Sequence, residues 1–239
     1  MPHAHNAARQ GQRLTVATYN IHRCIGRDGR CNPARVLDVL RALDADVIAL
    51  QEIAWQPREA LHQLEHFAQE LNYRAIAGAT LLRQDGHYGN AILTRLPVLD
   101  VRRIDLSVSG REPRGALGVA LDGGDGEVRV IATHLGLQPW ERRLQMTELL
   151  ELLARESIEP AILMGDLNEW FLWGRPLRWL HAYFGHSPAP RTWPAPLPLF
   201  ALDRILVKPR HRLAGLNVHA SRAARSASDH LPVRARIAI

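Results

Sequence analysis

Seven polar side chains lie at the ends of short apolar runs, where a strand stops and a site can begin. Five follow a run such as VATY, VIALQ, VIAT or ILMG, and two come directly before LPV. They are Asn20, Glu52, His134, Asp166, Asn168, Asp229 and His230. If the strands lie side by side, these groups converge on one rim of the sheets. Carboxylates, amides and imidazoles gathered in one place can bind a metal ion and transfer protons.

The oxygen donors among them indicate which metal such a rim would bind. Glu52, Asp166 and Asp229 carry carboxylates, and Asn20 and Asn168 carry amide oxygens. Hard oxygen donors of this kind suit Mg²⁺ or Mn²⁺ rather than zinc. Taken singly, each residue is also typical of a cap or a turn. Five of them in the same strand-end context favour the metal site.

The apolar runs predict many short strands and few helices. Strands are expected over 14–19, 46–52, 73–77, 89–95, 98–106, 115–121, 128–133, 161–164, 202–207, 216–219 and 233–237. Helices are expected over 58–71, 139–155 and 175–183, and after Asn32 and Pro33, which suit an N-cap and first turn. Turn residues at 122–126 predict a hairpin between the strands they separate, and five prolines predict a surface loop over 186–198.

This order of elements favours an α/β fold. We expect a four-layered sandwich, in which two mixed, mostly antiparallel sheets pack face to face with helices outside. The alternative is a doubly wound parallel sheet. It needs a helical crossover after nearly every strand, and residues 73–134 contain none. No repeat or linker divides the chain, so we expect one catalytic domain over 14–239 after a flexible N-terminal segment, 1–13.

The composition is that of a folded globular protein, with 239 residues, 46% of them hydrophobic and 23% charged. No run approaches the roughly 20 apolar residues of a membrane span, and residues 1–13 lack the apolar core of a signal peptide. We therefore expect a cytoplasmic monomer. Cys24 and Cys31 are too few for a disulfide scaffold and, even with His22 nearby, lack zinc-site spacing. We interpret them as loop or packing residues.

The net charge of +6 comes from the C-terminal part of the chain. Residues 201–239 contain two acidic and eight basic side chains, the latter being Arg204, Lys208, Arg210, Arg212, Arg222, Arg225, Arg234 and Arg236. A basic segment attracts a polyanion such as nucleic acid or an anionic lipid surface. The alternative is that the abundance of arginine is only compositional.

Six short motifs together carry a family resemblance. They are TYN at 18–20, LQE at 50–52, THL at 133–135, GDLN at 165–168, LDRI at 202–205 and SDH at 228–230. In this order they resemble the endonuclease/exonuclease/phosphatase superfamily, the deoxyribonuclease I-like proteins, from about residue 14 to 239. The resemblance implies a four-layered α/β sandwich and metal-dependent cleavage of a phosphoester.

The resemblance also implies roles for single residues. Glu52 looks like the principal metal ligand, with Asn20 beside it and Asp229 nearby. Asp166 and Asn168 resemble the pair that orients the attacking water and the phosphate. His230 resembles the catalytic histidine, Asp203 the carboxylate that orients it, and His134 the second histidine of some branches. Either Asp166 or the His230–Asp203 pair could take the proton of the water.

Substrate specificity depends on the loops around such a centre. Arg114 is a candidate phosphate clamp, and Trp170, Trp173 and Trp193 are candidate substrate-binding aromatics. The first interpretation is a nuclease, supported by the basic C-terminal segment. The second is a hydrolase of phospholipids or other small phosphoesters, since His22 stands where repair nucleases carry an aspartate. The third is an inactive binding module on the same fold.

Overall fold

The computed structural model describes residues 13–55, 60–83, 86–156 and 159–239. Residues 1–12 of the expected N-terminal segment lie outside these ranges. Arg13, assigned to that segment, instead begins the first strand, where it lies opposite Ala238 in an antiparallel pair.

The first sheet has six strands in the order β10-β11-β1-β2-β4-β3. Their bounds are β1 Arg13–Asn20, β2 Val47–Trp55, β3 Arg74–Arg83, β4 Gly86–Thr94, β10 Leu213–Val218 and β11 Val233–Ala238. Only β1 and β2 run parallel, and helix α1, Pro33–Leu43, connects them. The side chain of Asn32 caps α1 by accepting a hydrogen bond from the Arg35 amide, and Pro33 occupies its first position, as expected.

The second sheet has five strands in the order β5-β6-β7-β8-β9. Their bounds are β5 Val98–Asp105, β6 Gly115–Asp122, β7 Glu127–His134, β8 Ala161–Asp166 and β9 Asp203–Lys208. The antiparallel pairing of β6 with β7 confirms the hairpin expected around 122–126. The parallel pair is β7 and β8, joined through helix α3, Pro139–Glu156.

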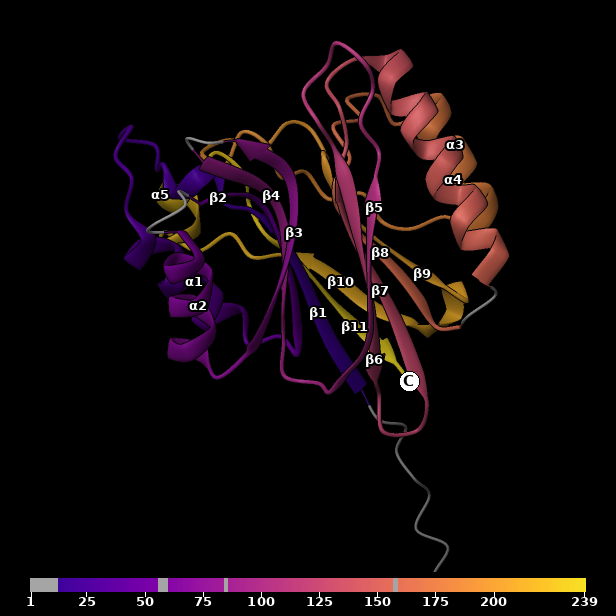
Figure 1. Cartoon of the computed structure of the whole chain (residues 1–239), viewed down its shortest axis with the longest axis horizontal. Helices are drawn as coiled ribbons and strands as arrows, with labels where there is room; N and C mark the ends of the chain where they lie inside the picture. The colour runs from indigo at the N-terminus through magenta and orange to yellow at the C-terminus, as the bar shows by residue number, and fades with distance from the viewer. Residues whose placement is uncertain (1–12, 56–59, 84–85, 157–158) are drawn as a thin grey trace, which may run out of the picture.

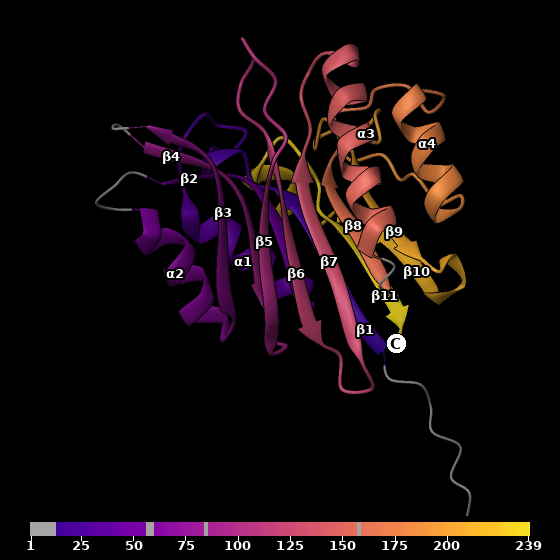
Figure 2. The same ribbon diagram turned by 45° about the vertical axis from the view of Figure 1, so that its right-hand side comes forward.

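The sheets pack face to face, with helices on both outer surfaces (Figure 1). Helices α1, α2 (Ala60–Leu71) and α5 (Ala224–Ala227) lie on one side, and α3 and α4 (Arg175–Phe184) cover the other sheet (Figure 2). Three apolar clusters correspond to this layering: one under α1, one between the sheets and one under α3 and α4. The four-layered sandwich expected from the sequence is therefore confirmed.

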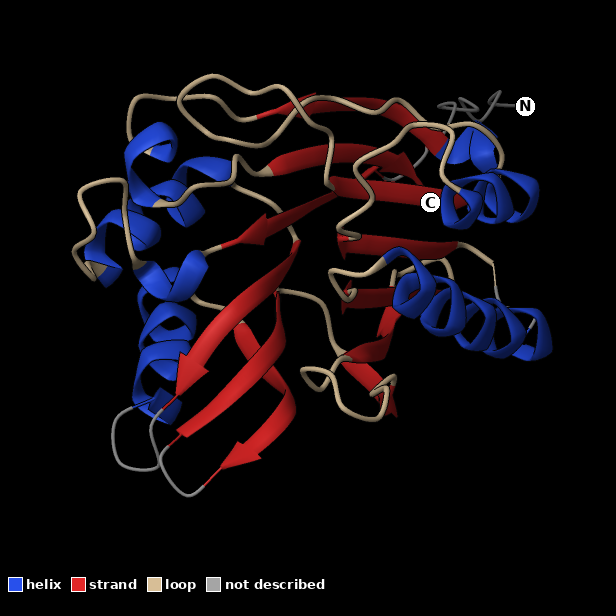
Figure 3. Cartoon of the chain, turned by 90° about the horizontal axis from the view of Figure 1, so that it is seen from above, coloured by secondary structure: helices blue, strands red, loops and turns tan. Residues whose placement is uncertain are grey.

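Most of the candidate residues lie at strand ends or in the loops beside them. Loops cross between the two groups of helices at one end of the sandwich (Figure 3). Glu52, expected to end a strand, lies inside β2, which continues to Trp55. Residues 186–198 contain no helix or named strand, as expected, although Thr192 and Ala195 in this loop are buried. None of the helices in the described ranges combines the length and apolar character needed to cross a membrane.

Candidate active site

Strand register in the second sheet places three of the expected residues in one row. His134 is the last residue of β7 and pairs with Asp166, the last residue of β8. Asp166 in turn pairs with Asp203, the first residue of β9. The facing sheet supplies Asn20 at the end of β1, whose side-chain amide donates to Asp166 over 3.0 Å. The two sheets thus meet at Asp166.

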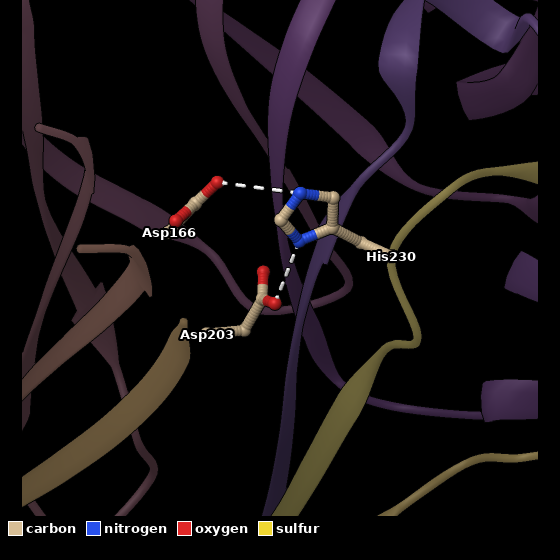
Figure 4. A group of neighbouring side chains, drawn as sticks. All are labelled: Asp166, Asp203 and His230. Carbon is tan, nitrogen blue, oxygen red and sulfur yellow. Dashed lines mark hydrogen bonds and ion pairs between the residues drawn. The ribbon is translucent and has the colours of Figure 1, made fainter. Parts of the chain in front are cut away.

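A buried chain of three ionisable groups crosses this meeting point (Figure 4). Nδ1 of His230 lies 2.8 Å from Oδ2 of Asp203, and Nε2 lies 3.7 Å from Oδ2 of Asp166. The imidazole therefore stands between two carboxylates, with Asp203 fully buried behind it. Within the described residues, this is the one group of three acidic, histidine or cysteine side chains with ligand atoms all within 4.8 Å of one another.

The carboxylates favour the protonated form of His230. Burial by itself lowers the pKa of an imidazole, but the charges of Asp203, Asp166 and Asp229 outweigh burial and raise the pKa of His230 to about 10. The hydrogen bond from Nδ1 to Asp203 also fixes the orientation of the ring. This is the Asp–His pair expected from the sequence.

His134 has the opposite environment. Its Nδ1 lies 3.0 Å from Nη1 of Arg114, and its Nε2 lies 3.0 Å from the side-chain amide of Asn168 and 3.5 Å from Oδ2 of Asp166. Burial and the neighbouring guanidinium lower the pKa of His134 to about 3. Arg114 also donates from Nη2 to Glu112, over 2.9 Å. Both terminal nitrogens of the Arg114 guanidinium thus already have partners within the protein. Arg114 is therefore less available for the role expected from the sequence, in which it binds a phosphate through two hydrogen bonds.

Glu52 is positioned by an irregularity in β2. The pairing of β2 with β4 shifts register between Leu50 and Ile53, and Glu52 adopts a φ of 57° inside this bulge. A bulge redirects a side chain, and a left-handed φ at a residue with a Cβ costs energy that is typically found at functional sites. Glu52 thereby reaches Asn20, whose amide donates to its Oε1 over 3.1 Å. Asn168 also has a left-handed φ, of 49°.

Asp229 lines the same cleft as Glu52. Its carboxylate accepts a hydrogen bond from Nε1 of Trp193 over 3.2 Å. Nδ1 of His22 lies 3.6 Å from this carboxylate. His22, two residues after the TYN motif, therefore also belongs to the site.

The cleft has a volume of about 330 Å³ and opens to solvent. Nine of the twelve expected site residues line it, namely Glu52, Arg114, His134, Asp166, Asn168, Trp170, Trp193, Asp229 and His230. Asn20 and Asp203 lie behind these residues and contact them through hydrogen bonds. Trp173 is not part of the lining; it is 72% exposed and packs against Phe171.

One buried pair behind the cleft was not recognised in the sequence. Arg142, in α3, is 1% exposed and lies 3.3 Å from the carboxylate of Glu169, the residue after Asn168. Arg142 also donates to the carbonyl of Leu137 over 2.6 Å. The one sequence feature that indicates this burial is helical spacing: Arg142 falls on the same face of the helix as the buried Met146 and Leu149.

The charge balance of the cleft suits a cation. Glu52, Glu112, Asp166 and Asp229 line it, against the guanidiniums of Arg23 and Arg114 and the protonated imidazole of His230. Among the described residues, no ion pair joins Glu52 to a basic side chain; its hydrogen-bond partner is the neutral amide of Asn20. A carboxylate such as Glu52, without a compensating basic side chain, fits a divalent metal such as Mg²⁺.

Comparison with known proteins identifies the family. The family model for the endonuclease/exonuclease/phosphatase family matches residues 17–230, a range that contains all the expected site residues. The chain belongs to this family. Members of the endonuclease/exonuclease/phosphatase family hydrolyse phosphoester bonds and are typically dependent on a divalent metal.

Two kinds of relative support the assignment. The uncharacterized protein YbhP of Escherichia coli is 30% identical over 241 residues, covering 93% of this chain and 95% of YbhP. A family member from Beutenbergia cavernae superposes with a TM-score of 0.75 at 24% identity, over 95% of this chain and 72% of that one. One from Bacteroides vulgatus gives a TM-score of 0.75 at 18% identity, over 94% and 98%. The fold is thus that of the deoxyribonuclease I-like superfamily.

Proposed function

We propose that this protein is a divalent-metal-dependent phosphodiesterase. The observation that carries the proposal is the buried chain from Asp203 through His230 to Asp166, opening into a cleft in which carboxylates outnumber guanidiniums. An inactive module on this fold has no need to keep these groups in contact with one another. The hydrogen bond from His230 to Asp203 and its ion-pair contact with Asp166 therefore favour an enzyme over a binding module.

Glu52, Asn20 and Asp229 are the residues that would hold Mg²⁺ or Mn²⁺. The bound cation would offset the negative charge of the phosphate and of its transition state. Asn20 also orients Glu52 and Asp166, because its amide nitrogen donates to both. Ser228 supports this arrangement, since its hydroxyl donates to the Asn20 carbonyl over 2.7 Å.

Two groups transfer protons in the proposed reaction. Asp166, held by the Asn20 amide and by the backbone N–H of Asn168, accepts the proton of the attacking water. His230, oriented through Nδ1 by Asp203, presents Nε2 as the donor to the leaving oxygen. Asn168 and His134 lie beside Asp166 and stabilise the phosphoryl oxygens by hydrogen bonding.

The eight C-terminal basic residues that favoured nucleic acid do not line the cleft. Four of them donate to backbone carbonyls: Arg210 to His186, Arg212 to Ala238, Arg225 to Ala195, and Arg234 to Asp44. Nucleic acid is supported instead by the family, which includes endonucleases and exonucleases. A phospholipid phosphodiester is the second candidate, supported by exposed apolar side chains beside the cleft. We place the enzyme in the cytoplasm as a monomer.

A substrate panel with Mg²⁺ tests the proposal. Duplex DNA, single-stranded DNA, RNA, phospholipid vesicles and inositol phosphates should include at least one substrate that is hydrolysed by the wild type and not by His230→Ala. Hydrolysis of none of them, or equal hydrolysis by both proteins, would contradict the proposed function.

A further inference from the structure

Large apolar side chains are exposed in an unusual concentration near the cleft. Among the described residues they come from segments 137–144, 171–173 and 197–199, which we together call the apolar rim, with Leu99 on β5 as the one exception. Scattered exposed leucines are normal in soluble proteins, whereas a contiguous apolar patch marks an interaction surface.

Each segment of the rim adjoins a residue that lines the cleft. Leu137 belongs both to the apolar rim and to the lining of the cleft. Trp170 lines the cleft and immediately precedes 171–173. Trp193 lines it as well, and its carbonyl accepts a hydrogen bond from the amide of Leu199 over 2.8 Å. The three segments therefore all adjoin the candidate phosphoester site.

Segment 171–173, which contains the most exposed of these side chains, Trp173, is held in place. The Phe171 carbonyl accepts from the amide of Gly174 over 2.9 Å, and the Phe171 amide donates to the buried carboxylate of Glu169 over 3.3 Å. The Phe171 and Trp173 rings lie 5.3 Å apart. A side chain added at Gly174 would meet the Glu169 carboxyl carbon at 2.4 Å, so the turn requires glycine there. The apolar side chains are thus presented by a fixed loop.

Basic side chains accompany the apolar ones. The guanidinium of Arg111 lies over the ring of Trp140, 5.2 Å from its centre. Arg175 is exposed two residues after Trp173, and the exposed Arg23 lines the cleft. Tryptophan and leucine that insert at the level of lipid headgroups, with arginine beside them for the phosphates, are the combination that binds an anionic bilayer.

We propose that the apolar rim docks this protein on the surface of an anionic phospholipid bilayer, so that the cleft faces the headgroup phosphodiesters. The choice of headgroup phosphodiesters as the substrate rests on the proposed phosphodiesterase function. The choice of the membrane-binding surface rests on the apolar rim. Nucleic acid is disfavoured because its binding is dominated by contacts of Lys and Arg to phosphates. Leucine and phenylalanine at 171–172, 197 and 199 offer no such contact.

The experiment measures binding separately from hydrolysis. In a His230→Ala background, flotation with phosphatidylglycerol/phosphatidylcholine vesicles should show binding that is weaker on phosphatidylcholine alone. Replacing Phe171, Leu172 and Trp173 together with Ser should weaken binding by about tenfold or more, because each buried apolar side chain contributes. Leu99→Ser, an exposed leucine outside the rim, is the matched control and should bind as the parent does.

Two further measurements keep the test decisive. Leu197→Ser with Leu199→Ser should weaken vesicle binding as well, and circular dichroism should show both rim variants folded. In the active protein, the rim variants should cleave a soluble bis-aryl phosphate at the wild-type rate and vesicle lipid more slowly. Loss of activity on every phosphoester with vesicle binding retained would count against the phosphodiesterase and not against the docking surface.

Three outcomes would overturn the docking proposal. In the first, the rim variants and Leu99→Ser bind vesicles equally. In the second, vesicles are not bound, and the rim variants lose binding to duplex DNA. In the third, the wild type is a dimer in sedimentation and the rim variants are monomers, which would make the rim a contact between copies of this chain.

Discussion

The guanidinium of Arg114 lies 3.0 Å from Nδ1 of His134, so a permanent cation faces one nitrogen of a buried imidazole. Since a guanidinium can only donate, Nδ1 accepts, which favours the neutral ring. Nε2 also faces a donor, the side-chain amide nitrogen of Asn168 at 3.0 Å. Oδ2 of Asp166 lies 3.5 Å from the same Nε2. His230, a short distance away, instead has a carboxylate at its Nδ1. The two histidines of the site therefore hold different charges, and only His230 is suited to give up a proton.

The protonation of His134 can be tested directly by NMR. Burial and Arg114 lower its pKa to about 3, so its ring should stay neutral across about pH 5 to 8. Arg114→Met should raise this pKa. In denaturant the same ring should titrate near its ordinary value of about 6.5. Titration of His134 near neutrality in the folded wild type would contradict the arrangement.

The proposed proton donor can be tested by varying the leaving group. His230→Ala should lower kcat by about 10²-fold or more on a substrate with an alkoxide leaving group, and by less when the leaving group is a nitrophenolate that needs no proton. Asp166→Asn should lower both rates similarly. His211→Ala, an exposed histidine in a short helical turn after β9, is the control.

The same donor has a defined pH dependence. Because the pKa of His230 is raised, its protonated form is present at neutral pH and is lost as the pH rises through about 10. The kcat for poor leaving groups should therefore fall on the alkaline side. If His230→Ala lowers kcat equally for the alkoxide and the nitrophenolate leaving groups, His230 is not the proton donor.

The metal requirement can be tested by chelation and by one substitution. EDTA should abolish hydrolysis, and Mg²⁺ or Mn²⁺ should restore it, because the carboxylates of the cleft repel an unneutralised phosphate. Glu52→Gln should raise the half-activating Mg²⁺ concentration by about tenfold or more. Mg²⁺ should also raise the Tm of the wild type more than that of the variant.

The exposed Glu70 on α2 supplies the control for this experiment. Glu70→Gln should leave both the half-activating concentration and the Mg²⁺-dependent Tm unchanged. Full turnover in EDTA would rule out the metal assignment.

The sequence predicts most of the framework because buried strands are continuous apolar runs, and the polar residue that ends each run is visible. Register then places His134, Asp166 and Asp203 in one row. What the sequence does not show depends on tertiary contacts. The sequence LQEI does not predict the bulge that redirects Glu52, because it contains no glycine or proline. Nor does it show that Arg114 would contact His134 rather than stand free.

The charges were the least predictable feature. The density of arginine in residues 201–239 indicates a binding surface, but charge density does not show what each side chain contacts. In the structure, Arg210, Arg212 and Arg234 satisfy backbone carbonyls. Arg142 shows the opposite discrepancy. Its position in a polar helix predicts a solvent-exposed charge, whereas its side chain is buried.

The buried pair of Arg142 and Glu169 should contribute strongly to stability. Arg142→Met should lower the free energy of unfolding by about 3–5 kcal/mol, because the carboxylate of Glu169, 4% exposed, would remain buried without its partner. Arg155→Met in the same helix is the matched control. It breaks an exposed pair with Glu151 at 3.8 Å and should cost no more than about 1 kcal/mol.

A double variant separates the two causes of this loss. Arg142→Met combined with Glu169→Leu removes the unpaired charge, so it should recover part of the stability in urea unfolding. It should not recover the order of the loop at Leu137, because the Leu137 carbonyl still lacks the donor that Arg142 provides. Amide exchange near Gly136 and Leu137 should therefore be faster in both variants than in the wild type. Exchange that stays slow in both would show that Arg142 does not hold this edge of the cleft.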